Sequence, residues 1–358
     1  GFQLDWRAFQ FPQHLYLGLL VTFGLAVLGT VCGVVLHWPL VAFLLHALAA
    51  GSYLLESLRR ASPVRSFLPK ANSQNLVAVR PAKGALRRRV VLLAHADAAF
   101  TGFLFHPTMI RLATKEPPRP FGWFKKQLGL VVLTVASLAL TDALGFAAIW
   151  YAPDWLRLAL TIPALVVVVL NLDVVLRNRV VPGACDNLSG CSTCVELAHR
   201  LSDAQPDDVE LVIVITGCEE AGTGGAIRLA EQLERSGAWK KDETVVLGLD
   251  TLSNGTLRYV EEGELWRIAV PAGIAAAIEA TSAAGPLQVP RFVIPTGATD
   301  ALPFVVRGWN AASLTCVDEA IGAPREYHYP TDTWSNIDVP QLEASVDFAE
   351  RLVRRLMA

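Results

Sequence analysis

Charged residues are scarce in this chain, and their signs nearly cancel. Asp, Glu, Lys and Arg make up only 18% of its 358 residues, whereas soluble domains contain about 25%. The formal net charge is -2, and the chain has no zinc knuckle or basic aromatic cluster, so we expect no nucleic-acid partner. Because 53% of the residues are hydrophobic, the shortage of charge predicts that part of the chain lies in lipid.

Cysteine is sparse too, and its spacing does not indicate a disulfide framework. The chain has six cysteines and is too long for a small disulfide scaffold. The pair Cys191-x-x-Cys194 suggests a metal or redox site, but it falls in a helix-like stretch and has no second CxxC beside it. We interpret both cysteines as core residues, since small buried cysteines are common.

Long apolar runs occur in two pairs, which are Leu15–Leu36 with Leu40–Leu55 and Leu128–Tyr151 with Leu156–Leu176. The first run has 22 residues and no charge, and at about 1.5 Å per residue it is long enough to cross a bilayer. It is too long for the core of a cleaved signal peptide. Buried helices of a soluble protein are the alternative, but Trp38 and Trp155 stand at the turns, where membrane proteins place aromatic belts. The sequence therefore predicts an integral, multi-pass membrane protein with four transmembrane α-helices in two hairpins.

Four spans place both termini on one side of the membrane. The flanks on that side are basic, with Arg59, Arg60, Arg65, Lys70, Lys125, Lys126, Arg177 and Arg179. The short turns on the other side carry no Lys or Arg, so the positive-inside rule predicts that the rest of the chain is cytoplasmic. Asp142 and Asp173 fall within or near the second hairpin, where charges are costly and often functional. Because Asp173 lies near the end of its run and close to Arg177, we interpret it as a snorkelled or paired residue at the interface. The stretch Phe103–Phe124 is either an amphipathic surface element or a linker.

Outside these runs the chain alternates strand-like and helix-like segments. The strand-like segments are Arg89–Ala94, Glu210–Thr216, Thr244–Leu249 and Ala311–Val317. The helix-like segments are Leu188–Leu201, Gly224–Glu234, Pro271–Ala284 and Val339–Met357. Apolar strands separated by helices predict an α/β fold, a three-layer αβα sandwich with a mostly parallel central sheet. In such sheets, functional sites form beyond the carboxyl ends of the strands.

Polar side chains stand at or near those strand ends: His95, Asp97, Asp186, Glu219, Glu220, Asp250 and His328. His95 and Asp97 follow a strand at i, i+2 spacing, so they share a face, as suits a metal-binding histidine with a supporting carboxylate. Glu219 and Glu220 are adjacent, so their side chains diverge, and one can bind metal while the other acts as general base. Asp186 precedes a helix and by itself could be an N-cap. Together, two histidines and three carboxylates fit two zinc ions that share a bridging carboxylate.

The same residues occur in recognisable local motifs. The motif segments are Ala94–Asp97, Gly183–Gly190, Gly217–Gly222, Leu249–Asp250 and His328–Thr333. In order and context they resemble the zinc aminopeptidase and glutaminyl cyclase family, over roughly Leu76–Asp97 and Val181–Met357. The segment Thr299–Phe304 resembles the family's Ser-Asp-His-x-Pro-Phe, although Ala301 replaces the usual histidine.

The resemblance implies a role for each residue. His95 and Asp250 would bind one zinc ion, Glu220 and His328 would bind the other, and Asp186 would bridge them. Glu219 would be the general base, and Asp97 would orient His95. The resemblance also implies a cis peptide bond after Asp186. Asp300 and Tyr327 are the residues that we expect to contact substrate.

The predicted organisation interrupts a catalytic domain with membrane helices. Residues 1–60 would form the first transmembrane hairpin, and residues 70–97 with 181–358 the zinc peptidase domain. Residues 98–180 would be an insertion that carries the second hairpin, at about 128–151 and 156–176. Soluble relatives have a much shorter link at this point.

The predicted function is that of a membrane-anchored zinc aminopeptidase with two zinc ions per chain. Its substrate would be a peptide, and membrane-embedded or lipid-modified peptides are one option. Two alternatives stay open. One is single-zinc glutaminyl cyclase chemistry, which forms pyroglutamate without an attacking water. The other is a non-catalytic scaffold, against which the complete ligand set argues.

Overall fold

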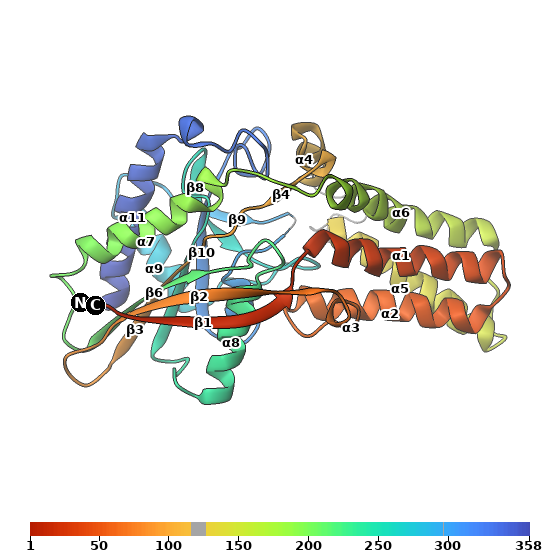
Figure 1. The fold of residues 1–358 in the computed structure, drawn as a ribbon, viewed down its shortest axis with the longest axis horizontal. Coiled ribbons are helices and arrows are strands. Elements are labelled where there is room, and N and C mark those ends of the chain that lie inside the picture. Colours follow the sequence, from red (N-terminus) through yellow and green to blue (C-terminus); the bar gives the residue numbers. More distant parts are fainter. Residues whose placement is uncertain (116–126, 296) are drawn as a thin grey trace.

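The computed structural model describes residues 1–115, 127–295 and 297–358. A sheet covered by helices forms one part of the molecule, and a bundle of long helices extends from it (Figure 1). Both chain ends lie on the far side of the sheet from the bundle (Figure 1). Lys125 and Lys126 lie outside the described residues, as does the later part of Phe103–Phe124. The first part of that stretch forms the short helices η1 (Phe103–Phe105) and α4 (Pro107–Ala113).

The described residues form one eight-stranded sheet with the order β1-β2-β6-β3-β7-β10-β8-β9. Its strands are β1 (Gln3–Pro12), β2 (Lys70–Arg80), β3 (Arg88–His95), β6 (Val209–Thr216), β7 (Thr244–Leu249), β8 (Thr256–Glu261), β9 (Arg291–Val293) and β10 (Asn310–Val317). The central strands β6, β3, β7 and β10 are parallel to one another. These four are the strands that the sequence predicts, and their aliphatic side chains are buried on both faces.

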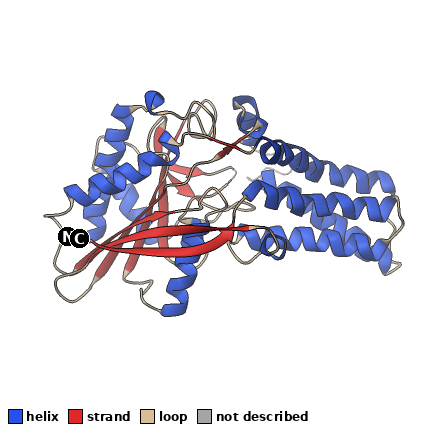
Figure 2. Cartoon of the chain, in the orientation of Figure 1, coloured by secondary structure: helices blue, strands red, loops and turns tan. Residues whose placement is uncertain are grey.

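Helices cover both faces of this sheet (Figure 2). The helices that pack on the sheet are α7 (Ser189–Arg200), α8 (Gly224–Ser236), α9 (Ala272–Ala283), α10 (Leu302–Val305) and α11 (Val339–Met357). One core cluster joins the sheet to α7, α9 and α11, and a second joins its other face to α8 and α10. The predicted α/β sandwich with a mostly parallel sheet is therefore confirmed.

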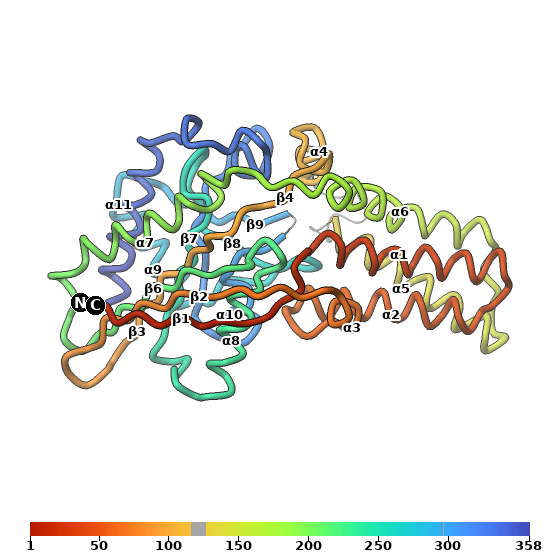
Figure 3. Tube along the Cα trace, in the orientation of Figure 1, coloured from red at the N-terminus to blue at the C-terminus, as the bar shows by residue number. Residues whose placement is uncertain are grey.

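Each pair of long helices is inserted between two antiparallel strands. Helices α1 (Leu15–Val34) and α2 (Pro39–Ser57), with the short α3 (Pro63–Ser66), lie between β1 and β2, whose pairing ends at Pro12 and Lys70. Helices α5 (Gln127–Phe146) and α6 (Asp154–Arg177) lie between β4 (Phe100–Thr101) and β5 (Arg179–Val180), which also pair. Figure 3 shows the chain leaving the sheet, forming each helix pair of the bundle and returning to the sheet.

Strand β1 is a difference from the predicted organisation, in which residues 1–60 form only a hairpin. Residues 3–12 instead belong to the edge of the sheet, antiparallel to β2. Most side chains of β1 are exposed, and Leu4 and Trp6 lie open to solvent. An exposed edge strand has no buried face that requires alternating apolar residues. The sequence of residues 3–12 therefore lacks the pattern that predicts a strand.

The long helices α1, α2, α5 and α6 pack into one antiparallel bundle. Each of them is long and apolar enough to cross a membrane. Their interior contains apolar residues such as Phe23, Ala26 and Tyr53. Their outer surface is also apolar, because Leu140, Ile162 and many other large side chains are exposed. Large exposed apolar areas of this kind mark surfaces that contact a partner protein or a membrane.

A cluster of polar side chains lies inside this bundle. Asp142 on α5 contacts His46 of α2, with 2.6 Å between Oδ2 and Nδ1, and Arg157 of α6, with 3.2 Å between Oδ1 and Nη2. The hydroxyl of Thr30 on α1 lies 3.1 Å from Nε2 of His46 and 2.6 Å from the hydroxyl of Thr161 on α6. All four helices thus contribute to one buried polar network.

The network shows how Asp142, a charged residue within an apolar run, is accommodated. Its side chain is only 1% exposed and is paired in the bundle interior. The partners come from two other runs, so no single run shows the pairing. Asp173 is paired with Arg177 near the end of α6, as expected, at 2.7 Å between Oδ1 and Nε.

Candidate metal centre

The predicted site residues come from the carboxyl ends of the central strands and from two loops. His95 is the last residue of β3, Glu219 and Glu220 follow β6, and Asp250 follows β7. Asp186 lies in the turn Ala184–Leu188 before α7, and His328 lies in the loop between β10 and α11. Because β3, β6 and β7 are parallel, their carboxyl ends meet at one edge of the sheet.

The two carboxylate oxygens of Asp186 face different histidines. Oδ1 lies 3.2 Å from Nε2 of His95, and Oδ2 lies 3.4 Å from Nε2 of His328. Glu220 faces the same nitrogen of His328, with Oε2 at 3.3 Å. His95, Asp186 and Glu220 each offer one ligand atom, and these three atoms all lie within 4.8 Å of one another. A carboxylate between two ligand sets is the arrangement that a bridging ligand requires.

Asp186 is held in place by the backbone contacts of its own loop. The carboxylate of Asp332 accepts hydrogen bonds from the backbone N–H groups of Cys185, at 2.7 Å, and Asp186, at 3.0 Å. The amide of Asn187 donates to the carbonyl of Leu249, at 2.9 Å. The peptide bond between Asp186 and Asn187 is cis, as the resemblance implies. Asp332 falls inside the motif segment His328–Thr333, but its position there does not by itself indicate this contact.

Asp97 supports the glutamate pair more directly than it supports His95. Its carboxylate accepts the backbone N–H groups of Glu219, at 3.0 Å, and Glu220, at 2.9 Å. Its distance to Nδ1 of His95 is 3.7 Å, which is too long for a hydrogen bond. The backbone carbonyl of Asp97 lies closer to that nitrogen, at 3.2 Å. The backbone carbonyl of Asp97 thus orients His95. The carboxylate of Asp97 orients the turn that carries Glu219 and Glu220.

Burial governs the ionisation of these carboxyl groups. It raises the pKa of Glu219 and of Glu220 well above the usual range, and the pKa of Asp250 to about 7. Burial also raises the pKa of Asp300 to about 6. Burial opposes ionisation of Asp186 as well, but hydrogen bonds from His328 and His95 outweigh it and lower its pKa.

The donor set fits zinc. Imidazole nitrogens and carboxylate oxygens are ligands that zinc prefers, and here they converge in a buried space. Oε1 of Glu220 is buried with no hydrogen-bond partner among the described residues, which is costly unless a cation lies beside it. Asp250, His95 and Asp300 line one small pocket at the end of β3 and β7.

The residues expected to contact substrate lie beside the ligands. Asp300 is buried and accepts a hydrogen bond from the hydroxyl of Thr216. The ring of Tyr327 packs on the ring of His328, with 4.0 Å between centroids. Their contact with substrate stays a prediction.

Two contacts of His328 come from segments that the sequence did not connect to the site. The hydroxyl of Tyr16, in the first turn of α1, lies 3.3 Å from Nδ1 of His328. The ring of Phe105, in η1, packs on the imidazole with 4.4 Å between centroids. Tyr16 sits in an apolar run, so its pattern predicts a membrane residue. The sequence feature that could have indicated its contact with the site is its polar hydroxyl at the start of that run.

Fold and site together define a zinc-metallopeptidase-like protein. Peptidase family M28 matches residues 164–353, more than half of the chain, and the chain belongs to this family. This confirms the family that the motifs indicate. No curated protein matches the chain.

Several solved structures resemble the chain weakly. The aminopeptidase from Aneurinibacillus sp. strain AM-1 has 16% identity and a TM-score of 0.49, and the match covers 80% of this chain and 48% of that one. Porphyromonas gingivalis glutaminyl cyclase has 14% identity and a TM-score of 0.46, with 80% and 77% covered. LapB from Legionella pneumophila has 11% identity and a TM-score of 0.49, with 97% and 77% covered. The chain thus spans about half the length of the Aneurinibacillus enzyme.

Proposed function

We propose that the chain is a membrane-anchored aminopeptidase with two zinc ions. The observation that carries this proposal is the position of Asp186, whose two oxygens face His95 and His328 separately. In this proposal His95 and Asp250 would hold one ion, Glu220 and His328 would hold the other, and Asp186 would be shared between them. Bound zinc would supply Lewis-acid chemistry, polarising the scissile carbonyl and lowering the pKa of water.

Glu219 is the proposed general base. Its side chain is buried, and Oε2 lies 4.0 Å from Nε2 of His95, so it borders the metal centre without being the nearest ligand to either histidine. Burial raises its pKa, which makes its carboxylate a stronger base. In the proposed reaction this carboxylate takes a proton from the attacking water and delivers it to the leaving amine. The hydrogen bonds from Glu219 and Glu220 to Asp97 hold the base in position.

Anchoring in a membrane is the second part of the proposal. The helices α1, α2, α5 and α6 expose apolar side chains outward and bury the polar network inward, as membrane bundles do. Trp38, Trp150 and Trp155 are exposed at the end of the bundle away from the sheet, where an aromatic belt would lie. The contact between Tyr16 of α1 and His328 supports a metal centre that would lie close to the membrane. A peptide held at or in the membrane is therefore the proposed substrate.

The catalytic part is proposed to lie on the cytoplasmic side, with the basic flanks as support. The test is to fuse to Ala358 a reporter enzyme that is active only outside the cytoplasm. We expect no reporter activity, and strong activity would contradict the proposed orientation.

The proposed activity is tested by zinc content together with a substrate screen in detergent. We expect two zinc ions per chain and hydrolysis of aminoacyl reporter substrates. One zinc ion with pyroglutamate formation from a peptide with N-terminal Gln would indicate the glutaminyl cyclase alternative. Zinc binding without either activity would indicate a non-catalytic role.

A further inference from the structure

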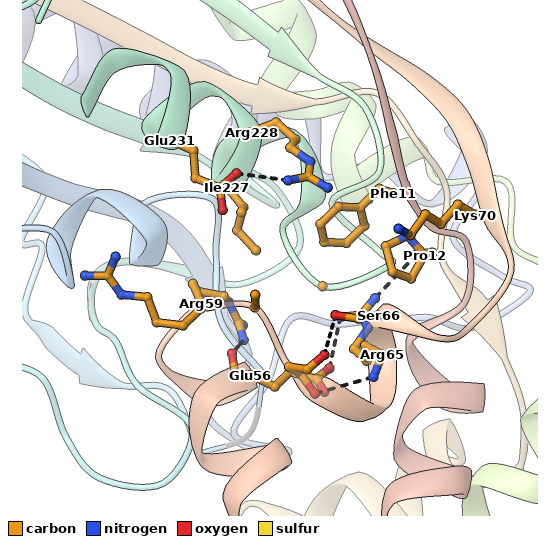
Figure 4. A pocket seen from close by; sticks show the side chains of 14 residues that line it. Phe11, Pro12, Glu56, Arg59, Arg65, Ser66, Lys70, Ile227, Arg228 and Glu231 are labelled. Carbon is orange, nitrogen blue, oxygen red and sulfur yellow. Dashed lines mark hydrogen bonds and ion pairs between the residues drawn. The ribbon is translucent and has the colours of Figure 1, made fainter. Parts of the chain in front are cut away.

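A pocket lies where the bundle meets the catalytic part, away from the metal centre's ligands (Figure 4). It is lined by the end of β1, the last turn of α2, the segment that contains α3, and the first turns of α8. Its empty volume is about 570 Å³, part of which is open solvent. Figure 4 shows the side chains of Arg65, Lys70 and Arg228 around it.

The pocket carries an excess of positive charge. Its charged lining residues are Glu56, Arg59, Arg60, Arg65, Lys70, Arg228 and Glu231. Arg65 pairs with Glu56 at 2.9 Å, and Arg228 pairs with Glu231 at 2.9 Å. Arg59 pairs with Glu264, at 2.8 Å. Arg60 and Lys70 are exposed and have no ion pair among the described residues, so two cationic groups are left for an anion.

The pocket is placed at the level where lipid headgroups would lie. Helix α2, one of the four helices that could cross a membrane, ends at Ser57, and the lining residues Glu56 and Arg59 flank that end. Phe67, directly after α3, is 91% exposed. An exposed aromatic ring beside basic residues is typical of the interface between lipid and water.

An apolar stripe on α2 leads from the bundle towards this pocket. Val41, Leu44, Leu48 and Leu55 are all exposed, and their spacing places them along one face of the helix. Gly51 continues this face, and no other group lies within 4 Å of where its Cβ would be. The stripe therefore offers a shallow apolar track for an acyl chain, which a free phosphate would not need.

We propose that this pocket binds the phosphate headgroup of an anionic phospholipid, with Arg60 and Lys70 as its unpaired cationic contacts. Clusters of Lys and Arg just beyond the end of a transmembrane helix are suited to such headgroups, and this pocket has five basic lining residues beside the end of α2. The proposal rests on the membrane anchoring proposed above but does not require peptidase activity.

The pocket is connected to the glutamate pair by Arg65. This side chain lines the pocket, pairs with Glu56, and donates a hydrogen bond to the backbone carbonyl of Ala221, which follows Glu220. The next residue, Gly222, has φ +101°, and a Cβ there would come within 2.7 Å of Nη1 of Arg65. Gly222 itself lines the pocket, so a bound headgroup would border the loop that carries Glu219 and Glu220.

The test measures lipid binding by the full chain in detergent micelles. The probe is a fluorescent phosphatidylglycerol, compared with a phosphatidylcholine that carries the same label. We expect one phosphatidylglycerol per chain, and about 30-fold weaker binding in the double variant Arg60→Gln/Lys70→Gln, because each basic group near an anionic surface contributes a factor of roughly five. The matched control is Arg177→Gln/Arg179→Gln, which removes two basic flank residues near α6 and should keep binding within about twofold.

The outcomes separate the possible sources of the anion. The proposal that this pocket binds the lipid would be overturned if the double variant bound phosphatidylglycerol as tightly as the parent chain. It would also be overturned if the control variant lost as much affinity as the double variant. If inorganic phosphate competed as effectively as unlabelled phosphatidylglycerol, the ligand would be free phosphate, and the proposal of a lipid ligand would be overturned. Unchanged zinc content in the double variant shows that it is folded. A chain that binds phosphatidylglycerol but hydrolyses no peptide would contradict the proposed function and leave this inference standing.

Discussion

The hydroxyl of Tyr16 lies 3.3 Å from Nδ1 of His328, although the two residues are 312 positions apart. Nε2 of the same imidazole faces Asp186 and Glu220, so the ring is contacted on both nitrogens. Tyr16 is 4% exposed, and Phe105 packs against both rings. A residue of the first membrane-type helix therefore supports a proposed metal ligand.

The first prediction concerns Tyr16→Phe. The substitution keeps the ring packing and removes the partner of Nδ1, so His328 should hold its orientation less firmly. Loss of such a supporting group weakens metal affinity by about 10–100-fold. Zinc affinity measured by competition with a chelator tests this. Tyr53→Phe is the control, because Tyr53 is equally buried but donates to Glu264 instead of a proposed ligand. Equal affinities in the parent chain and in Tyr16→Phe would rule out this support.

The second prediction concerns Glu219→Gln. The amide cannot accept the proton from water, so hydrolysis should fall by about 10²–10⁴-fold while zinc content stays unchanged. Initial rates with an aminoacyl reporter and metal analysis of the same sample provide the measurement. Glu196→Gln, on the exposed face of α7, should keep full activity. Near-normal turnover in Glu219→Gln would refute the assignment of the base.

The third prediction concerns removal of the metal. The folded-state pKa values of Asp250, about 7, and Asp300, about 6, lie above the value of about 3.9 for unfolded Asp. The unfolded chain therefore loses these protons first, and the metal-free protein should lose stability as pH rises from about 4 through 7.

Zinc should reverse this trend, because its ligands bind in their deprotonated forms. Thermal unfolding of chelator-treated and zinc-loaded samples should thus diverge as the pH is raised from 5 to 8. A metal-free sample that becomes more stable over that range would contradict the third prediction.

The fourth prediction concerns the polar network of the bundle. Asp142→Ala would leave His46 and Arg157 buried without their shared carboxylate. Breaking a buried ion pair from one side costs about 3–5 kcal/mol of unfolding free energy. Asp173→Ala removes a partly exposed pair with Arg177 and a hydrogen bond from the backbone N–H of Phe103, and should cost only about 1–2 kcal/mol. Thermal stability in detergent compares the two variants, and similar losses would show that the network does not hold the bundle.

The central strands and the proposed ligands could be predicted because their signals are local. The segments that form β3, β6, β7 and β10 are continuous apolar runs, which are typical of a doubly covered sheet. Their parallel arrangement then brings His95, Glu219, Glu220 and Asp250 to one edge without further information. The edge strand β1 had no such signal, since neither of its faces is buried along most of its length.

The sequence by itself determined the elements and the chemistry: four long apolar helices, a parallel core, and histidines and carboxylates suited to zinc. Only the tertiary structure decided which elements meet. It placed Tyr16 against His328, brought Arg157 and His46 to Asp142, and directed the carboxylate of Asp97 to the Glu219–Glu220 turn. The physical reason is that apolar periodicity and strand-end position are properties of neighbouring residues. A contact between distant residues depends instead on how whole helices and loops pack.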